Sequence, residues 1–321
     1  MFRKKIWRAR THCVAAVLVL TAAGLAAQAQ ESITIGSVPA TSSHFPYAVA
    51  MAAAIRKELP NRNISLIETG ASVDNHKRLG RGEIEIALTT SSVAIQATNG
   101  LGKFEGKAQN DLLVLYVCDF SVMNMAVRVD SGVTRIEDLK GKRFSPGIRG
   151  SGAELLTNNA FELFDIGAEL VPGTLTEAVE GIQNRDLVGY AKYGLGTNID
   201  ATLREIMVST EMRIIGLDEE QQEKLMQKVP GLTMYDLPEG LIPNQPAVTS
   251  PGIAVIYLTR KGMLDDDTAY AIAKAMGERH GEISEAMPHT KNYDYRAMTL
   301  AIENVGLKIH PGAERYWTKS E

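Results

Sequence analysis

Apolar residues recur along most of the chain in two alternating patterns. Short runs in which every second residue is apolar, such as SITIGS at 32–37, predict β-strands. Longer segments with apolar residues three or four positions apart predict α-helices; at 46–59, for example, Tyr47 and Met51 fall on one helix face. Strands that alternate with helices are typical of parallel sheets covered by helices. The pattern therefore predicts an α/β fold.

The alternation breaks at residues 112–129, where the runs LLVLYVCDF and VMNMAVRVD follow each other without a helix. A second strand-rich segment begins near residue 253. Two α/β blocks separated by two such segments indicate two lobes joined by two strand crossings, whereas one large doubly wound sheet explains 112–129 less well. We expect lobe 1 at residues 30–121 and 253–321, and an inserted lobe 2 at 122–252.

The first 29 residues have the pattern of a secretory signal peptide. Five basic and no acidic residues occur in MFRKKIWRAR, fifteen uncharged residues follow, and Ala27-Gln28-Ala29 resembles a cleavage site. A membrane anchor is the alternative, but a span needs about 20 apolar residues. We therefore expect a periplasmic protein. No later stretch is long and apolar enough to predict membrane insertion after cleavage.

The composition, with 45% hydrophobic and 22% charged residues, is typical of a soluble globular protein. Cleavage after Ala29 would change the formal charge from −4 to −9, and an acidic chain is a poor partner for nucleic acid. Cys118 would then be the only cysteine, so no disulfide is expected within the chain.

Motifs of metal centres and of common enzymes are absent from the sequence. It lacks C-x-x-C, H-E-x-x-H, a P-loop and G-x-S-x-G, and its histidines are scattered without ligand spacing. We therefore expect no metal, no cofactor and no enzymatic activity. A secreted hydrolase that uses a cleft serine with His44 is the rival interpretation.

Small polar loops follow several predicted strands. In an α/β sheet such loops meet at the carboxyl edge, where ligands bind and helix N-termini favour anions. The loops lie at 37–46, 69–75, 88–92 and 145–154. Several such loops without a nucleophile and base pair indicate a binding cleft.

The sharpest of these loops is GIRGSG at 147–152. Gly147, Gly150 and Gly152 let the backbone approach a ligand closely, Ser151 can cap a helix, and Arg149 can bind a carboxylate through two hydrogen bonds. A glycine-rich turn with a solvated arginine is the alternative.

Three segments, taken in order, carry a resemblance to a known family. TGASVDNHKRLGRGEIEIAL at 69–88, IEDLKGKRFSPGIRGSGAE at 136–154 and GLKIHPGAERYW at 306–317 resemble the TAXI family of solute-binding subunits of TRAP transporters. The resemblance implies a two-lobed type II periplasmic binding protein fold, with a hinge of two strand crossovers and a ligand cleft between the lobes. It also implies delivery of a small solute to TRAP membrane subunits. An ATP-driven importer or a sensor kinase would use the same fold.

The resemblance implies a set of ligand contacts, and three departures from the family pattern add to it. Ser43 and His44 replace a glycine-rich first loop, Ser92 replaces an aspartate, and Arg149 replaces a small residue or proline. These changes make the cleft more positive and predict a small carboxylate as the solute. The expected ligand-binding residues are Ser43, His44, Phe45, Ser72, Asn75, Ser91, Ser92, Gly147, Arg149, Gly150, Ser151, Gly152, Tyr193 and Gly194.

Overall fold

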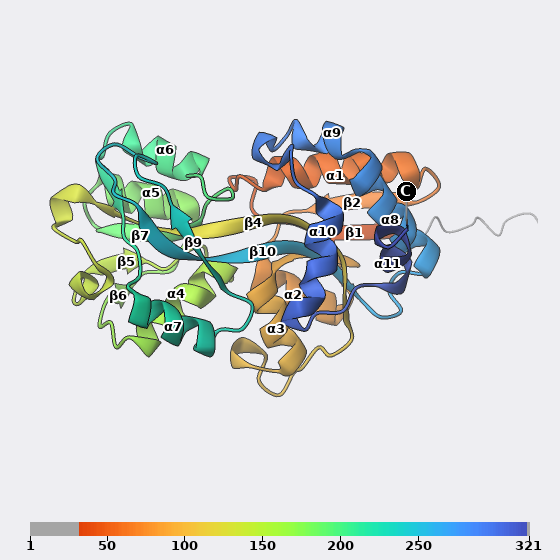
Figure 1. The fold of residues 1–321 in the computed structure, drawn as a ribbon, viewed down its shortest axis with the longest axis horizontal. Coiled ribbons are helices and arrows are strands. Elements are labelled where there is room, and N and C mark those ends of the chain that lie inside the picture. The colour runs from red at the N-terminus through yellow and green to blue at the C-terminus, as the bar shows by residue number, and fades with distance from the viewer. Residues whose placement is uncertain (1–31, 320–321) are drawn as a thin grey trace, which may run out of the picture.

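The computed structural model describes residues 32–319, which form two lobes joined by two long strands (Figure 1). The expected signal peptide at 1–29 lies outside the described residues. Within 32–319 no helix is long and apolar enough to cross a membrane. Each lobe is built around its own hydrophobic clusters.

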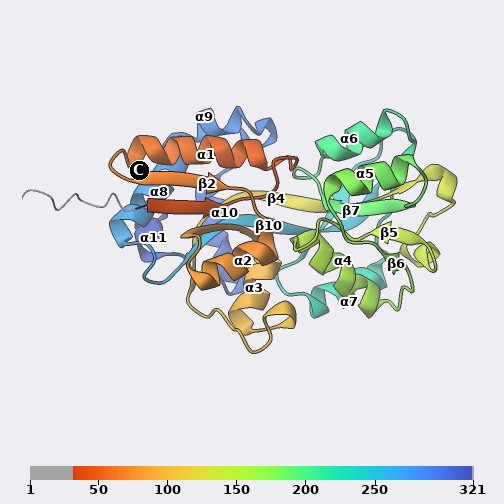
Figure 2. The same ribbon diagram turned by 180° about the vertical axis from the view of Figure 1, so that it is seen from behind.

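Lobe 1 is a parallel sheet, β2-β1-β3, with helices on both faces (Figure 2). Every residue of β3 is buried, as expected for a central strand. Helices α1 and α9 lie on one side of this sheet, and α2 and α3 on the other. The elements are β1 (Ser32–Gly36), α1 (Phe45–Glu58), β2 (Asn63–Ile67), α2 (Ser72–Arg81), β3 (Ile86–Thr90), α3 (Ser91–Asn99), α8 (Asp266–Glu278), α9 (His280–Ser284), α10 (Tyr295–Leu300) and α11 (Pro311–Trp317).

Two antiparallel strands, β4 (Leu112–Arg128) and β10 (Val248–Arg260), run through both lobes. They pair from Gly252↔Val122 to Arg260↔Leu112. In lobe 1 β10 also pairs with β3, and in lobe 2 β4 continues alongside β7. The two runs expected at 112–129 are thus one strand, because nearly every residue of β4 is buried and no polar turn interrupts it.

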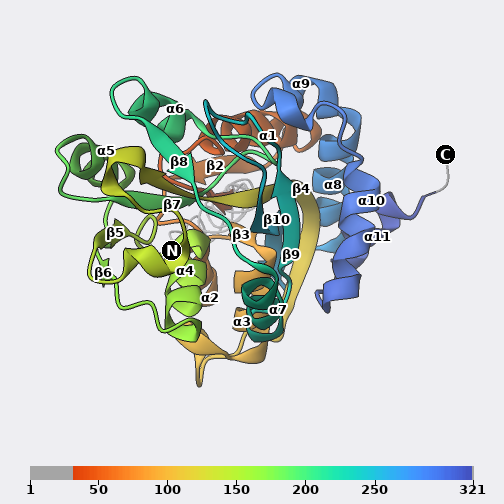
Figure 3. The same ribbon diagram turned by 60° about the vertical axis from the view of Figure 1, so that its left-hand side comes forward.

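Lobe 2 repeats the α/β pattern around the order β4-β7-β5-β6, with β5 parallel to both β6 and β7 (Figure 3). We call β4 and β10 the hinge strands, and two further strands pair with them, β8 with β4 and β9 with β10. The elements are β5 (Arg143–Ser145), α4 (Gly152–Leu163), β6 (Glu169–Leu170), α5 (Leu175–Gln183), β7 (Gly189–Tyr193), α6 (Ala201–Met207), β8 (Met212–Ile214), α7 (Glu219–Lys228) and β9 (Thr233–Leu237).

The buried side chains form one large hydrophobic cluster in lobe 1 and two smaller ones in lobe 2. Several residues of lobe 2 cross this division, Leu195 and Leu232 among them. Leu155 of α4 is buried in the lobe 1 cluster, and Tyr193 at the end of β7 packs against clusters of both lobes. The lobes are therefore closed against each other in this structure.

Candidate functional site

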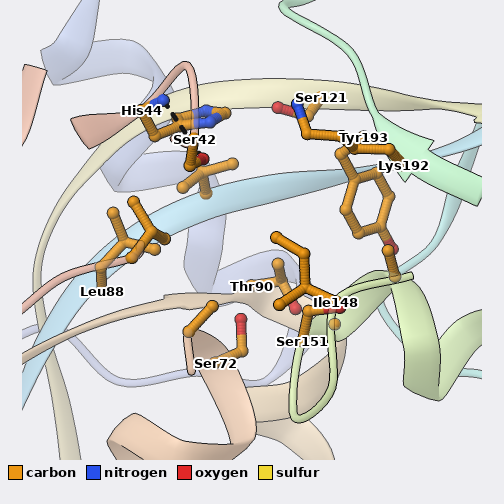
Figure 4. A pocket seen from close by; sticks show the side chains of 15 residues that line it. Ser42, His44, Ser72, Leu88, Thr90, Ser121, Ile148, Ser151, Lys192 and Tyr193 are labelled. Carbon is orange, nitrogen blue, oxygen red and sulfur yellow. Dashed lines mark hydrogen bonds between the residues drawn. The ribbon is translucent and has the colours of Figure 1, made fainter. Parts of the chain in front are cut away.

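A cavity of about 70 Å³ lies between the lobes, where strands β1, β3 and β7 end (Figure 4). Lobe 1 contributes the loop before α1 and the first turn of α2, and lobe 2 contributes the loop before α4. Strands β3 and β7 and the two long strands β4 and β10 supply the remaining wall. The lining residues are Val38, Ser42, His44, Ala71, Ser72, Leu88, Thr90, Ser121, Ile148, Ser151, Gly152, Ala153, Lys192, Tyr193 and Val255.

Two buried hydroxyl groups in the cavity wall have no hydrogen-bond partner among the described residues. They are Ser121 Oγ on β4 and Tyr193 Oη at the end of β7. Burial raises the pKa of Tyr193, so its hydroxyl stays protonated and can donate. Because an unpaired buried hydroxyl is unfavourable, both groups are placed to bind a ligand that enters the cavity.

Two helix N-termini also face the cavity. Ser72 opens α2, and Gly152 opens α4 after its N-cap Ser151, whose Oγ accepts a hydrogen bond from Glu154 N at 3.1 Å. The first N–H groups of a helix have no intrahelical acceptor and carry partial positive charge. The lining residues include no acidic side chain, and their one lysine, Lys192, is ion-paired with Asp200. The wall thus favours an anionic group.

Behind the cavity, a buried carboxylate fixes His44. Asp119 of β4 accepts hydrogen bonds from Nε2 of His44 and Nε2 of His289, each at 3.1 Å. Burial raises the pKa of Asp119, but the bonds from His289 and His44 outweigh burial and lower it. Because His44 Nε2 is bonded to Asp119, that nitrogen is not free to activate a serine. Within residues 32–319, no group of three or more His, Cys, Asp or Glu side chains could hold a metal ion.

Five of the predicted site residues line the cavity: His44, Ser72, Ser151, Gly152 and Tyr193. Several others support the wall from behind. Asn75 is fully buried, and its Nδ2 donates to the carbonyls of Ser37 at 2.8 Å and Leu88 at 2.7 Å, which ties α2 to β1 and β3.

The remaining predicted residues of lobe 1 lie near the cavity without lining it. Ser91 Oγ donates to Gly231 O at 3.2 Å, and Ser92 Oγ lies 3.4 Å from Thr90 Oγ1. Phe45 begins α1 and packs against the lobe 1 cluster, and Ser43 Oγ is buried without a hydrogen-bond partner in the described part of the chain.

The predicted glycines of lobe 2 shape the backbone next to the cavity. Gly147 has φ 127°, and a Cβ there would lie 2.8 Å from Glu154 N, so only glycine fits. Gly150 O accepts from Val73 N at 2.9 Å across the lobes, and Gly194 N donates to Val122 O at 2.8 Å.

Arg149 does not line this cavity, so the expectation that it binds the carboxylate of the ligand stays a prediction. Its side chain is exposed, and Nη2 donates to Pro172 O at 3.0 Å. Ile148 forms a β-bridge with Gly173, and Arg149 N donates to Gly173 O. Arg149 lies in a turn that Ser151 N closes by donating to Ile148 O at 2.9 Å; Ile148 lines the cavity, whereas Arg149 lines only a neighbouring hollow of about 630 Å³.

Sequence reasoning missed the residues that strands contribute, notably Thr90, Ser121 and Lys192. Ser121 lies between the two apolar runs of β4. A single serine at that position was the feature of the sequence that could have indicated a polar contact in the cavity. Lys192 carried no signal, because its charge partner Asp200 becomes its neighbour only through the fold.

The NMT1-like family model matches residues 35–319. The chain is also similar to three solved structures. A putative L-cystine ABC transporter from Listeria monocytogenes is 13% identical with a TM-score of 0.53, over 83% of this chain and 98% of that chain. An ABC uptake transporter substrate-binding protein from Streptococcus pneumoniae with bound histidine is 14% identical, TM-score 0.53, over 84% and 95%. XAC2383 from Xanthomonas citri bound to ATP is 11% identical, TM-score 0.53, over 91% and 100%.

These likenesses concern the fold. The two lobes, the hinge of β4 and β10 and the cavity between the lobes are those of a type II periplasmic binding protein. The narrower resemblance to the TAXI family stays a prediction, because the matching family is the NMT1-like one.

Proposed function

The chain belongs to the NMT1-like family, and from that premise we propose that it is an extracytoplasmic solute-binding protein rather than an enzyme. One observation carries the proposal. Ser121 and Tyr193 bring buried, unpartnered hydroxyls to one interlobe cavity. A solute that bonds to both groups and touches both lobes would stabilise the closed arrangement by its differential contacts.

We propose a small solute with an anionic group, of which a carboxylate is the first candidate. The support is the pair of helix N-termini at Ser72 and Gly152 and the lack of an acidic side chain among the lining residues. Arg149 does not support an anionic solute in the cavity, because its side chain lines the hollow.

We further propose that the solute passes to an ABC-type importer. Two of the similar proteins above are a putative L-cystine ABC transporter and an ABC uptake transporter substrate-binding protein, and this favours an ATP-driven partner over TRAP membrane subunits. The neighbouring genes discriminate the two: an ATPase and permease gene supports the proposal, and genes for TRAP membrane subunits overturn it. We also propose that lobe 2 spans residues 122–252, since Val122 and Gly252 are ladder partners at the crossing.

Native mass spectrometry of the protein as purified tests the binding function by identifying a retained solute, and calorimetry then measures its affinity. We expect Tyr193→Phe and Ser121→Ala each to weaken binding about tenfold, because each removes one hydrogen bond. Tyr190→Phe is the matched control, since the Tyr190 hydroxyl is also buried and unpartnered in the described residues but lies outside the cavity. Equal affinities for all four proteins would contradict the proposal.

A further inference from the structure

The interlobe cavity and the larger hollow that holds Arg149 lie back to back. Neighbouring residues of lobe 1 line one each: Val38 lines the cavity and Pro39 the hollow, and Ala71 lines the cavity and Gly70 the hollow. Among residues 32–319, Ile148 is the one that lines both. Its side chain is therefore the partition between the two spaces, and Figure 4 shows it projecting toward the centre of the cavity.

The backbone holds Ile148 firmly in this position. Its β-bridge to Gly173 and the bond from Arg149 N to Gly173 O at 3.0 Å fix the loop on its outer side. Gly147 and Gly150, with φ 127° and 80°, turn the chain on either side of it. Ile148 thus sits on an anchored backbone segment, as a residue that sets the size of a site must.

The two spaces differ greatly in size, so the partition limits what the cavity accepts. The cavity measures about 70 Å³ and the hollow about 630 Å³. A solute that extends from the cavity in this direction meets the Ile148 side chain before it reaches the hollow.

We propose that Ile148 is the residue that sets the length of the bound solute, because its side chain limits how far a solute can extend from the cavity toward the hollow. The inference rests on the proposed binding function. The size of the side chain at position 148 then controls which solute lengths the site accepts. A shorter side chain opens the cavity into the hollow, and a longer one fills the cavity. The hollow's own Arg149, Thr174 and Glu177 would become contacts for a longer solute.

Calorimetry with unbranched monocarboxylates from acetate to octanoate, and with α-amino acids of matching length, tests this inference. We expect the wild-type protein to reject the long members and Ile148→Ala to bind octanoate at least about tenfold more tightly than the wild type. We expect Ile148→Phe to lose the longer members that the wild type still binds. Val171→Ala is the control, because Val171 lines only the hollow and should leave the length limit unchanged.

The outcomes separate the two proposals. An unchanged length limit in Ile148→Ala, with thermal unfolding that shows a folded variant, overturns the role of Ile148 and leaves the binding function standing. A limit shifted equally by Val171→Ala also overturns it. If neither the wild type nor Ile148→Ala binds any member of either series, the proposed function fails and the inference fails with it.

Discussion

Buried polar side chains around the cavity have two different roles. Asn75 Nδ2 donates hydrogen bonds to the carbonyls of Ser37 and Leu88, and Asp119 accepts hydrogen bonds from two imidazoles. These groups therefore fix the wall of the cavity. Ser121 and Tyr193 have unpaired hydroxyls in the described structure and face the cavity. Asn75 Oδ1 is also buried without a partner in the described residues but does not line the cavity, so a candidate ligand contact needs both an unpaired polar atom and a place in the cavity wall.

His76 of α2 makes stability depend on pH. It is fully buried, and its ring bonds to Gln109 Oε1 at 2.9 Å and Thr89 Oγ1 at 3.1 Å. Burial lowers its pKa from 6.5 to about 4, so between these values the unfolded chain binds more protons than the folded chain. Stability is therefore lost as the pH falls from 6.5 to 4. We expect the free energy of unfolding to drop by about 2 kcal/mol between pH 7 and pH 5 from this group.

Urea unfolding at several pH values measures this drop. We expect His76→Gln to flatten the dependence between pH 7 and pH 5, whatever its effect on stability at pH 7. Part of the slope should remain, because burial also lowers the pKa of His310. An unchanged slope in His76→Gln would show that His76 does not bind its proton on unfolding.

At the scale of elements, the local pattern predicts strands and helices well but not their limits. The apolar runs at 112–129 are one strand, since β10 and β7 pair along its whole length and no local signal reveals those partners. Helix α8 ends at Glu278 and α9 begins at His280, and only Arg279 lies between them. The inward direction of Ile148 likewise depends on Gly173, which lies far along the chain, so the sequence predicted the loop but not which side chain faces the cavity.

The closeness of β7 to β4 depends on a residue without a side chain. A Cβ at Gly189 would lie 2.2 Å from Ala126 O and 2.8 Å from Val127 Cα, and backbone atoms cannot move aside cheaply. We expect Gly189→Ala to lower the free energy of unfolding by about 1–3 kcal/mol, as overpacking does. Gly281→Ala is the control, because nothing lies within 4 Å of a Cβ there. Urea unfolding compares them, and equal stabilities would contradict the expectation.

At the scale of the whole molecule, a few hydrogen bonds join the lobes directly. Val73 N donates to Gly150 O at 2.9 Å, which connects α2 with the loop before α4. Ser91 Oγ donates to Gly231 O of lobe 2 and accepts from Ala254 N of β10, both at 3.2 Å. Ser91 therefore holds lobe 2 against the hinge, although it does not line the cavity.

Removal of the Ser91 hydroxyl should favour the open arrangement. We expect Ser91→Ala to increase the radius of gyration in small-angle scattering and to weaken solute binding about fivefold, since one interlobe hydrogen bond is lost. Ser92→Ala is the control, because Ser92 contacts Thr90 within lobe 1. A radius of gyration in Ser91→Ala equal to those of the wild type and Ser92→Ala would contradict this role.

The return of β10 to lobe 1 also constrains the order in which the chain can fold. Thr90 at the end of β3 pairs with Val255, so the central ladder of lobe 1 needs a strand that follows all of lobe 2. Such pairing across a long stretch of chain is slow to form. During synthesis, which starts at the N-terminus, the edge of β3 in lobe 1 stays unpaired until lobe 2 and then β10 have been made. An exposed strand edge of this kind can pair with strands of other chains. The hinge that permits closure therefore also makes newly synthesised lobe 1 prone to aggregation.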